Sequence, residues 1–272
     1  MSLTAPELQV IKNRMKTTWT SGDYGLVARS LERGTDEFVN RLGIPPGAQV
    51  LDVACGSGNV AIAAARRGAR VTGLDIAPNL LEQARARASA EGLDARFDEG
   101  DAEGMPYADR SFDVVVTMFG AMFTPRPAMT AAELVRVCRP GGTVAMANWT
   151  PEGFSGQMFR TVGRHVPPPP NVPPPVLWGE ERVVRERLQA GIASLHTSKR
   201  LCPIQYSFPP GDVVQLFRGY FGPVKLAFDA LDAAGQAALQ RDLEQLWTAH
   251  NRAADGGTLV ESEYLEVLAR RE

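Results

Sequence analysis

The sequence predicts an α/β protein with a mostly parallel sheet, and two features carry this prediction. Short apolar runs alternate with stretches of helical periodicity between residues 48 and 149, as in successive strand–helix–strand units. An acidic residue also lies at or just after the end of each of the first three runs, at Asp52, Asp75 and Asp101. Because an open parallel sheet binds its ligand outside the carboxyl ends of its strands, we expect these carboxylates to meet at one crevice.

The first 47 residues are predicted to form a helical cap. Apolar side chains recur at spacings of three and four from residue 4 to about residue 42, which indicates two or three helices. The run Ile44-Pro45-Pro46-Gly47 ends this pattern, because prolines and glycine punctuate a helical sequence. The sheet is therefore expected to begin at residue 48.

Residues 48–150 are expected to contain five strands and three helices. The clearest strand is a β-branched run that ends at Met118. Pro78 suits the first turn of a helix, and Arg139-Pro140-Gly141-Gly142 is typical of a turn that ends another. The expected strands are 49–53, 70–74, 95–98, 112–118 and 143–149, and the expected helices are 58–67, 78–88 and 129–137.

The alternation stops after Trp149. Residues 151–178 are rich in glycine and proline, and their proline run favours polyproline II over a sheet. We expect 151–225 to form a substrate-covering insertion that also supplies a strand of the sheet, and 226–272 to form a helix and the closing strand. The expected strands here are 192–208 and 258–270, which brings the sheet to seven strands, and the expected helices are 180–189, 212–220 and 232–253.

Composition and charge exclude several classes of protein. A formal charge of −2 gives no basic excess for nucleic acid or an anionic membrane surface, so neither is expected as a partner. No run approaches the ~18 apolar residues that span a bilayer, and the N-terminus lacks the pattern of a signal peptide. Three scattered cysteines form no disulfide framework, which indicates a reducing, cytoplasmic setting. The three histidines lack metal-ligand spacing, so no metal is expected.

A glycine-rich turn follows the first strand, and two cofactor types compete for it. Gly56-x-Gly58-x-x-Ala61 with Asp75 downstream fits a dinucleotide site, so an NAD(P)-dependent oxidoreductase is one alternative. Asp52 argues against it, because an ionised carboxylate about 4 Å from a phosphate costs roughly 4 kcal/mol at an effective dielectric near 20. The same carboxylate attracts an ammonium group. The turn therefore favours a cationic nucleoside without phosphate, such as S-adenosylmethionine.

Four segments together resemble the class I S-adenosylmethionine-dependent methyltransferases, in particular the small-molecule group called type 11. In order and spacing they match the family across about 48–149; they are 50–58, 73–77, 100–113 and 134–142. The resemblance implies a Rossmann-like, seven-stranded sheet with helices on both faces. One departure is Ala54, where many members carry a glycine, and we expect it to be tolerated with a slightly altered backbone approach.

The resemblance also implies a role for each candidate residue. Asp52 holds the cofactor's ammonium group, Asp75 accepts from the ribose hydroxyls, and Asp101 accepts from the adenine amino group. Ile76 and Met105 are expected to enclose the adenine ring. The full set of expected cofactor-binding residues is Asp52, Ala54, Gly56, Gly58, Asp75, Ile76, Asp101, Ala102, Met118 and Phe119. Whether Trp19 and Tyr24 cover the cofactor is left open.

The resulting functional hypothesis is transfer of a methyl group, by in-line displacement, to a small, partly hydrophobic metabolite. No catalytic residue can be assigned, and the sequence does not separate O-, N- and C-methylation. Side chains in the region expected to cover the acceptor are His165, His196, Tyr206 and Tyr220. The alternatives are the NAD(P)-dependent oxidoreductase and a catalytically silent S-adenosylmethionine-binding protein. A monomer or a homodimer is expected.

Overall fold

The computed structural model describes residues 4–272, which build one seven-stranded sheet with the strand order β3-β2-β1-β4-β5-β7-β6. Strands β1 to β5 are parallel, and β7 is antiparallel to both of its neighbours. The predicted mostly parallel α/β fold is therefore confirmed. The strands are β1 Gln49–Val53, β2 Arg70–Asp75, β3 Ala95–Glu99, β4 Phe112–Met118, β5 Cys138–Trp149, β6 Ile192–Tyr206 and β7 Thr258–Arg271.

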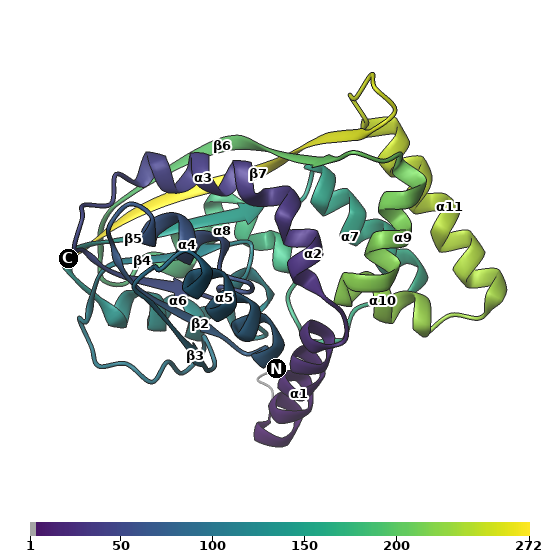
Figure 1. Cartoon of the computed structure of the whole chain (residues 1–272). Helices are drawn as coiled ribbons and strands as arrows, with labels where there is room; N and C mark the ends of the chain where they lie inside the picture. The colour runs from purple at the N-terminus through teal and green to yellow at the C-terminus, as the bar shows by residue number, and fades with distance from the viewer. Residues whose placement is uncertain (1–3) are drawn as a thin grey trace.

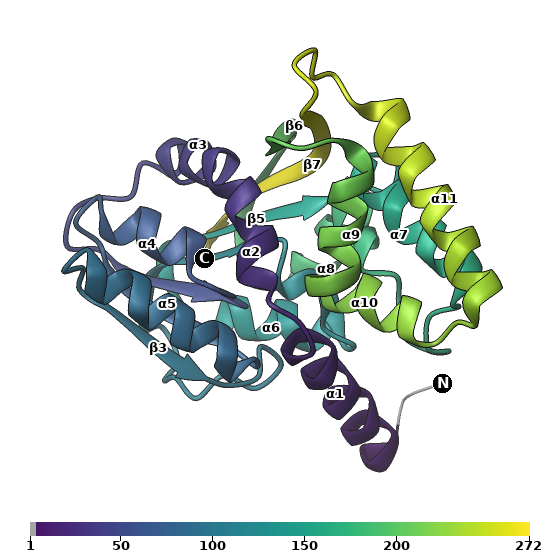
Figure 2. The same ribbon diagram turned by 45° about the vertical axis from the view of Figure 1, so that its right-hand side comes forward.

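Helices cover both faces of the sheet (Figures 1 and 2). On one face α3, α4 and α5 lie side by side, and on the other α6 packs beside α8. The residues of α4 are mostly alanines with buried side chains, so this helix approaches the sheet closely. These helices are α3 Glu32–Leu42, α4 Asn59–Ala65, α5 Pro78–Ala90, α6 Pro127–Val137 and α8 Glu181–Leu188.

The order of the strands reverses at β1, which lies between β2 and β4. In an open sheet the connecting helices leave in opposite directions at such a point, and a crevice opens at the carboxyl ends of the strands. Val50, Leu51 and Val53 of β1 are fully buried, which makes this strand the centre of the core. The topology therefore places a site at the end of β1.

A second group of helices lies beyond one end of the sheet, where the long strands β6 and β7 extend past the others (Figures 1 and 2). Among them, α7 and α10 were not predicted from the sequence, because glycine and proline are frequent around them. Helix α7 nonetheless buries one face, at Phe154, Met158 and Thr161. The members of this group are α7 Phe154–His165, α9 Pro210–Tyr220, α10 Gly222–Asp229 and α11 Ala233–His250.

Strand β5 begins earlier than expected. The predicted turn at 139–142 belongs to the strand itself, which starts at Cys138 and contains a register shift opposite Phe112 and Val114. Gly141 has a φ of +70°, and a Cβ at Gly142 would crowd the Arg139 carbonyl oxygen at 2.8 Å. The two glycines thus permit a bulge where a turn was expected.

The N-terminal segment forms two further helices, α1 Ala5–Thr20 and α2 Tyr24–Ala28, before α3. Helix α1 starts with a capping box between Thr4 and Glu7, buries none of its residues and projects from the body of the protein (Figures 1 and 2). Within residues 4–272, no helix is long and apolar enough to cross a membrane.

Helix α3 is fixed to the sheet by a buried ion pair. Arg41 donates from Nε and Nη2 to Glu266 of β7, at 2.9 and 2.7 Å, and from Nη2 to the Tyr264 hydroxyl at 2.6 Å. Glu266 is only 4% exposed, and its other partner, Arg200, is more distant at 3.4 Å. Without Arg41, the Glu266 carboxylate would be buried with one weak partner.

We therefore expect Arg41→Ala to lower the free energy of unfolding by about 2 kcal/mol. Urea denaturation checks this, with Arg33→Ala as the matched control on the same helix. Arg33 is exposed and pairs with Glu37 one turn away, so its loss is expected to cost within about 0.5 kcal/mol. Equal losses in the two variants would show that the Glu266 pair does not fix α3.

Candidate functional site

A cavity of about 940 Å³, counting space open at its mouth, lies at the carboxyl ends of β1, β2 and β4. The topology thus brings the three predicted acidic residues to one place. The predicted residues that line the cavity are Asp52, Ala54, Gly56, Asp75, Ile76, Asp101, Ala102, Met118 and Phe119.

Gly58 is the predicted residue that does not line the cavity. It has a φ of +85° and precedes the first turn of α4. A Cβ at this position would lie 3.0 Å from the Cβ of Ala84 in α5. Gly58 therefore permits the close packing of α4 on α5. Its left-handed backbone resembles that of a cofactor-binding glycine, which explains the sequence-based expectation.

The turn after β1 carries a backbone conformation that side chains rarely adopt. Ala54 has a φ of +56° and Gly56 a φ of +53°, and for alanine this conformation costs about 1–2 kcal/mol. The methyl group of Ala54 faces Gly120, where an added Cβ would overlap the Ala54 carbonyl oxygen. The departure from glycine at 54 is thus accommodated by a glycine at 120.

Asp52 is 1% exposed and stands at the end of β1. Its Oδ2 accepts a hydrogen bond from the Ala61 backbone N–H at 3.0 Å, and no ion pair reaches it from residues 4–272. Burial, opposed by the Ala61 hydrogen bond and reinforced by nearby Asp75, raises the pKa of Asp52 to about 8. The ordinary value is 3.8, so the folded protein holds a proton here at neutral pH that the unfolded chain has lost. The contribution of Asp52 to stability therefore falls as the pH rises towards 8.

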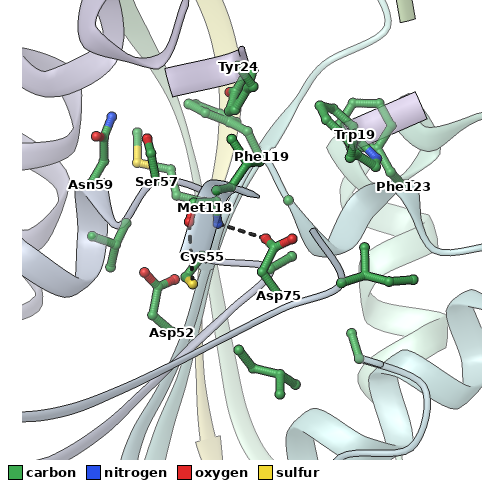
Figure 3. Close-up of a pocket in the computed structure, with 18 of the residues that line it drawn as sticks. Trp19, Tyr24, Asp52, Cys55, Ser57, Asn59, Asp75, Met118, Phe119 and Phe123 are labelled. Atoms are coloured by element: carbon green, nitrogen blue, oxygen red, sulfur yellow. Dashed lines mark hydrogen bonds between the residues drawn. The ribbon is translucent and has the colours of Figure 1, made fainter. Parts of the chain in front are cut away.

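Asp75 ends β2 and anchors the glycine-rich turn. Its Oδ2 accepts from the Gly56 backbone N–H at 2.7 Å (Figure 3), and its Oδ1 accepts from the Ala77 N–H at 2.9 Å. Burial raises the pKa of Asp75, and these backbone hydrogen bonds oppose the shift. Each carboxylate oxygen has a second lone pair, so Asp75 can still accept from two ligand hydroxyls.

Asp101 is bound by the N-terminal helix. Lys12 of α1 forms ion pairs with Asp101 and, at 2.8 Å, with the buried Glu103. Glu103 also accepts from the backbone N–H and Nε of Arg126, at 2.5 and 2.8 Å. The sequence analysis did not identify Lys12, because 89 residues separate it from Asp101 and no local pattern connects them. These contacts place α1 over one end of the cavity.

Phe119 follows β4 with a φ of +61°, which is strained for a bulky residue. Its ring stacks on Trp149, with centroids 3.5 Å apart and planes 7° apart, and meets Tyr264 edge-on. This conformation turns the chain so that Gly120 reaches Ala54. The strain thus brings the end of β4 against the glycine-rich turn.

Aromatic side chains from the N-terminal helices cover the cavity. Trp19 and Tyr24, whose role the sequence left open, both line it together with Phe123 (Figure 3). Trp19 packs edge-on against Tyr24 and Phe123, with centroids 5.5 and 5.0 Å apart. The rings enclose the side of the cavity opposite the carboxylates.

Other candidates from the sequence lie elsewhere. Met105, expected beside the adenine ring, is buried but does not line the cavity. His165 bonds to Asp242 at 2.8 Å, between α7 and α11, and the side chain of His196 lies on the exposed edge strand β6. The Tyr206 hydroxyl bonds to Ser30 at 3.1 Å, and Tyr220 is exposed. None of these five residues lines the cavity, so neither the two histidines nor the two tyrosines are placed to act as a general base there.

Comparison with known proteins identifies the class of protein to which this chain belongs. A family model described as a methyltransferase domain matches residues 50–142. An uncharacterized protein of Mycobacterium tuberculosis is 36% identical over 98% of this chain and 97% of its own length. A demethylmenaquinone methyltransferase of Deinococcus radiodurans is 37% identical over 53% of this chain and 64% of its own length. The crystal structure of the YcgJ protein from Bacillus subtilis has a similar fold, with a TM-score of 0.60 at 18% identity over 88% of this chain and 98% of that chain.

The chain belongs to the class I S-adenosylmethionine-dependent methyltransferases, and S-adenosylmethionine is the cofactor of this class. The resemblance predicted from the sequence motifs is therefore confirmed. The alternative of an NAD(P)-dependent oxidoreductase is removed.

The contact between Gly120 and Ala54 can be tested directly. We expect Gly120→Ala to lower the free energy of unfolding by about 2 kcal/mol or more, because the new methyl group overlaps backbone that cannot move aside. Gly104→Ala is the matched control, since nothing lies within 4 Å of its added Cβ, and a change within about 0.5 kcal/mol is expected. Denaturant unfolding of both variants measures this. Wild-type stability of the Gly120 variant would contradict the contact.

Proposed function

We propose that the carboxylates of Asp52, Asp75 and Asp101 hold the ammonium, ribose and adenine parts of S-adenosylmethionine, and that the methyl group passes to a small, partly hydrophobic metabolite. The observation that carries the proposal is the state of Asp52. Its buried carboxyl group lines the cavity and, among residues 4–272, has no cationic partner. At pH 7 this carboxyl group keeps its proton, and a ligand ammonium group favours its ionised form, which a pyrophosphate does not.

The other two acidic residues suit the neutral parts of the cofactor. Asp75 is held by two backbone N–H groups and keeps lone pairs for the two ribose hydroxyls. Asp101 is half-exposed at the mouth of the cavity, with the backbone of Ala102 beside it, and can accept from an adenine amino group while Lys12 remains paired. Leu80 and Ile76 supply apolar surface for the adenine ring between them.

The reaction needs alignment more than acid–base chemistry. S-Adenosylmethionine supplies an activated methyl group. The bond from the acceptor's nucleophile to the methyl carbon forms while the carbon–sulfur bond breaks, and the electron pair of that bond stays on the sulfur. Positioning of this kind lowers the activation barrier by up to about 7–11 kcal/mol. A proton on the nucleophile passes to water. The residues around the sulfur are expected to be Met118 and Phe119, which line the cavity at the end of β4.

The walls of the site support a partly hydrophobic acceptor. Aromatic rings from α1 and α2 line the cavity, and such surface suits a ligand with apolar parts. The name of the Deinococcus relative, a demethylmenaquinone methyltransferase, also denotes an apolar ring as acceptor. A net charge of −2 supports a small molecule over nucleic acid, and the unpaired cysteines support a cytoplasmic setting.

We expect Asp75→Ala to raise the dissociation constant of S-adenosylhomocysteine about tenfold or more, because the acceptor of both ribose hydroxyls is lost. Asp101→Ala is expected to raise it less. Asp94→Ala is the control, since its exposed carboxylate lies outside the cavity. Isothermal titration calorimetry measures all three, and thermal unfolding confirms that each variant is folded. An unchanged dissociation constant in a folded Asp75 variant would refute the ribose assignment.

A further inference from the structure

A second cavity lies beside the cofactor cavity. Its volume is about 390 Å³, counting the space that is open to solvent. Its walls come from α2, the end of β5 and helices α7, α9 and α11. Among residues 4–272, no Asp, Glu, Lys, Arg or His side chain lines it. A ligand bound there would meet aromatic and apolar surface without a counter-ion.

The two cavities share a wall. Tyr24 and Leu31 line both of them, and Phe119 of the first cavity stacks on Trp149 of the second. The Tyr24 ring lies over the glycine-rich turn, since a Cβ at Gly56 would be 3.8 Å from its ring carbons. The shared wall therefore stands at the end of the cofactor site where the methionine part is expected.

Two hydroxyl groups at the second cavity are already bonded to protein. The Ser30 hydroxyl meets the Tyr206 hydroxyl at 3.1 Å, and the Ser155 hydroxyl accepts from Ser262 at 2.9 Å. The Tyr24 hydroxyl differs, because among residues 4–272 it has no hydrogen-bond partner. Burial raises the pKa of Tyr24 well above its usual value. The hydroxyl therefore stays neutral and does not act as a base.

The aromatic walls favour a flat ring as the occupant. Trp247 meets Phe154 and Phe217 edge-on, with centroids 4.5 and 5.2 Å apart, and Phe221 meets Phe217 in the same way. Such edge-to-face arrangements present both ring faces and ring edges to a guest, and both pack well against another aromatic ring.

We propose that the second cavity binds the aromatic body of an uncharged methyl acceptor, whose nucleophilic group lies beside the Tyr24 hydroxyl at the boundary with the cofactor cavity. This inference rests on the proposed function and names its acceptor class. Tyr24 is a positioning residue: its neutral hydroxyl orients the nucleophile towards the methyl group. An acceptor with a carboxylate or ammonium on its ring body is excluded, because that charge would be buried without a partner.

The experiment compares two probes that differ in charge. The protein saturated with S-adenosylhomocysteine is titrated by calorimetry at pH 7 with 2-naphthol, which is neutral, and with 2-naphthoate, which is anionic. We expect 2-naphthol to bind and 2-naphthoate to bind at least about tenfold more weakly. Absence of 2-naphthol binding, or equal binding of the two probes, would overturn the acceptor class.

Two variants locate the binding. Met158 lines the second cavity, so Met158→Trp is expected to weaken 2-naphthol about tenfold or more by filling it. Met129→Trp, on the exposed surface of α6, is the matched control and is expected to change nothing. Tyr24→Phe keeps the ring, so it is expected to weaken 2-naphthol about fivefold while leaving naphthalene unchanged. Equal weakening of both probes would show that Tyr24 only fills space.

The same titrations separate this inference from the proposed function. Binding of S-adenosylhomocysteine is measured in each variant before the probe is added. If the wild-type protein does not bind S-adenosylhomocysteine, the proposed function is overturned. If Met158→Trp binds S-adenosylhomocysteine and also keeps the full affinity for 2-naphthol, only the proposed acceptor site is overturned.

Discussion

The burial of one carboxyl group, that of Asp52, is the constraint on which the site depends. Asp52 lies near the end of β1, accepts a hydrogen bond from the first turn of α4 and faces a cavity that supplies no cationic side chain among residues 4–272. The strained turn that follows is fixed by Asp75 through the Gly56 N–H. In the empty cavity a proton neutralises Asp52, and a positively charged cofactor takes the place of that proton.

The three acidic residues face the cofactor in different states, although they look alike in the sequence. Asp52 is buried without a cation, Asp75 is held by backbone N–H groups, and Asp101 is already paired with Lys12. Helix α1 is held over the cavity by the ion pairs of Lys12 and by the ring of Trp19, which packs on Tyr24, Phe123 and Phe221. Salt screens the partly exposed ion pair of Lys12 with Asp101. A higher ionic strength is therefore expected to weaken this contact of α1 more than the backbone hydrogen bonds of Asp75.

The sequence predicted what is local in this protein. Strand ends and the acidic residues that follow them are set by patterns a few residues long, so Asp52 and Asp75 were placed correctly at the cavity. Lys12 was not identified, because its partners lie far away in the chain. Gly58 was assigned to the cofactor because it belongs to the glycine-rich motif. In the structure it instead permits the close packing of α4 on α5, which the motif does not distinguish from ligand binding. Helix α7 was missed because flanking glycines and prolines hid its apolar face. The proton on Asp52 depends on burial, which no motif encodes.

The proton balance of cofactor binding tests the central claim most directly. Calorimetric titration with S-adenosylmethionine at pH 7, in two buffers of different ionisation enthalpy, gives the number of protons released. Since the pKa of Asp52 is raised to about 8 by burial, the empty protein holds this proton and the bound ammonium group expels it. The account predicts release of close to one proton, lost in Asp52→Asn, and tighter binding as the pH rises from 6 to 8. Binding without proton release, or the same release in Asp52→Asn, would contradict it.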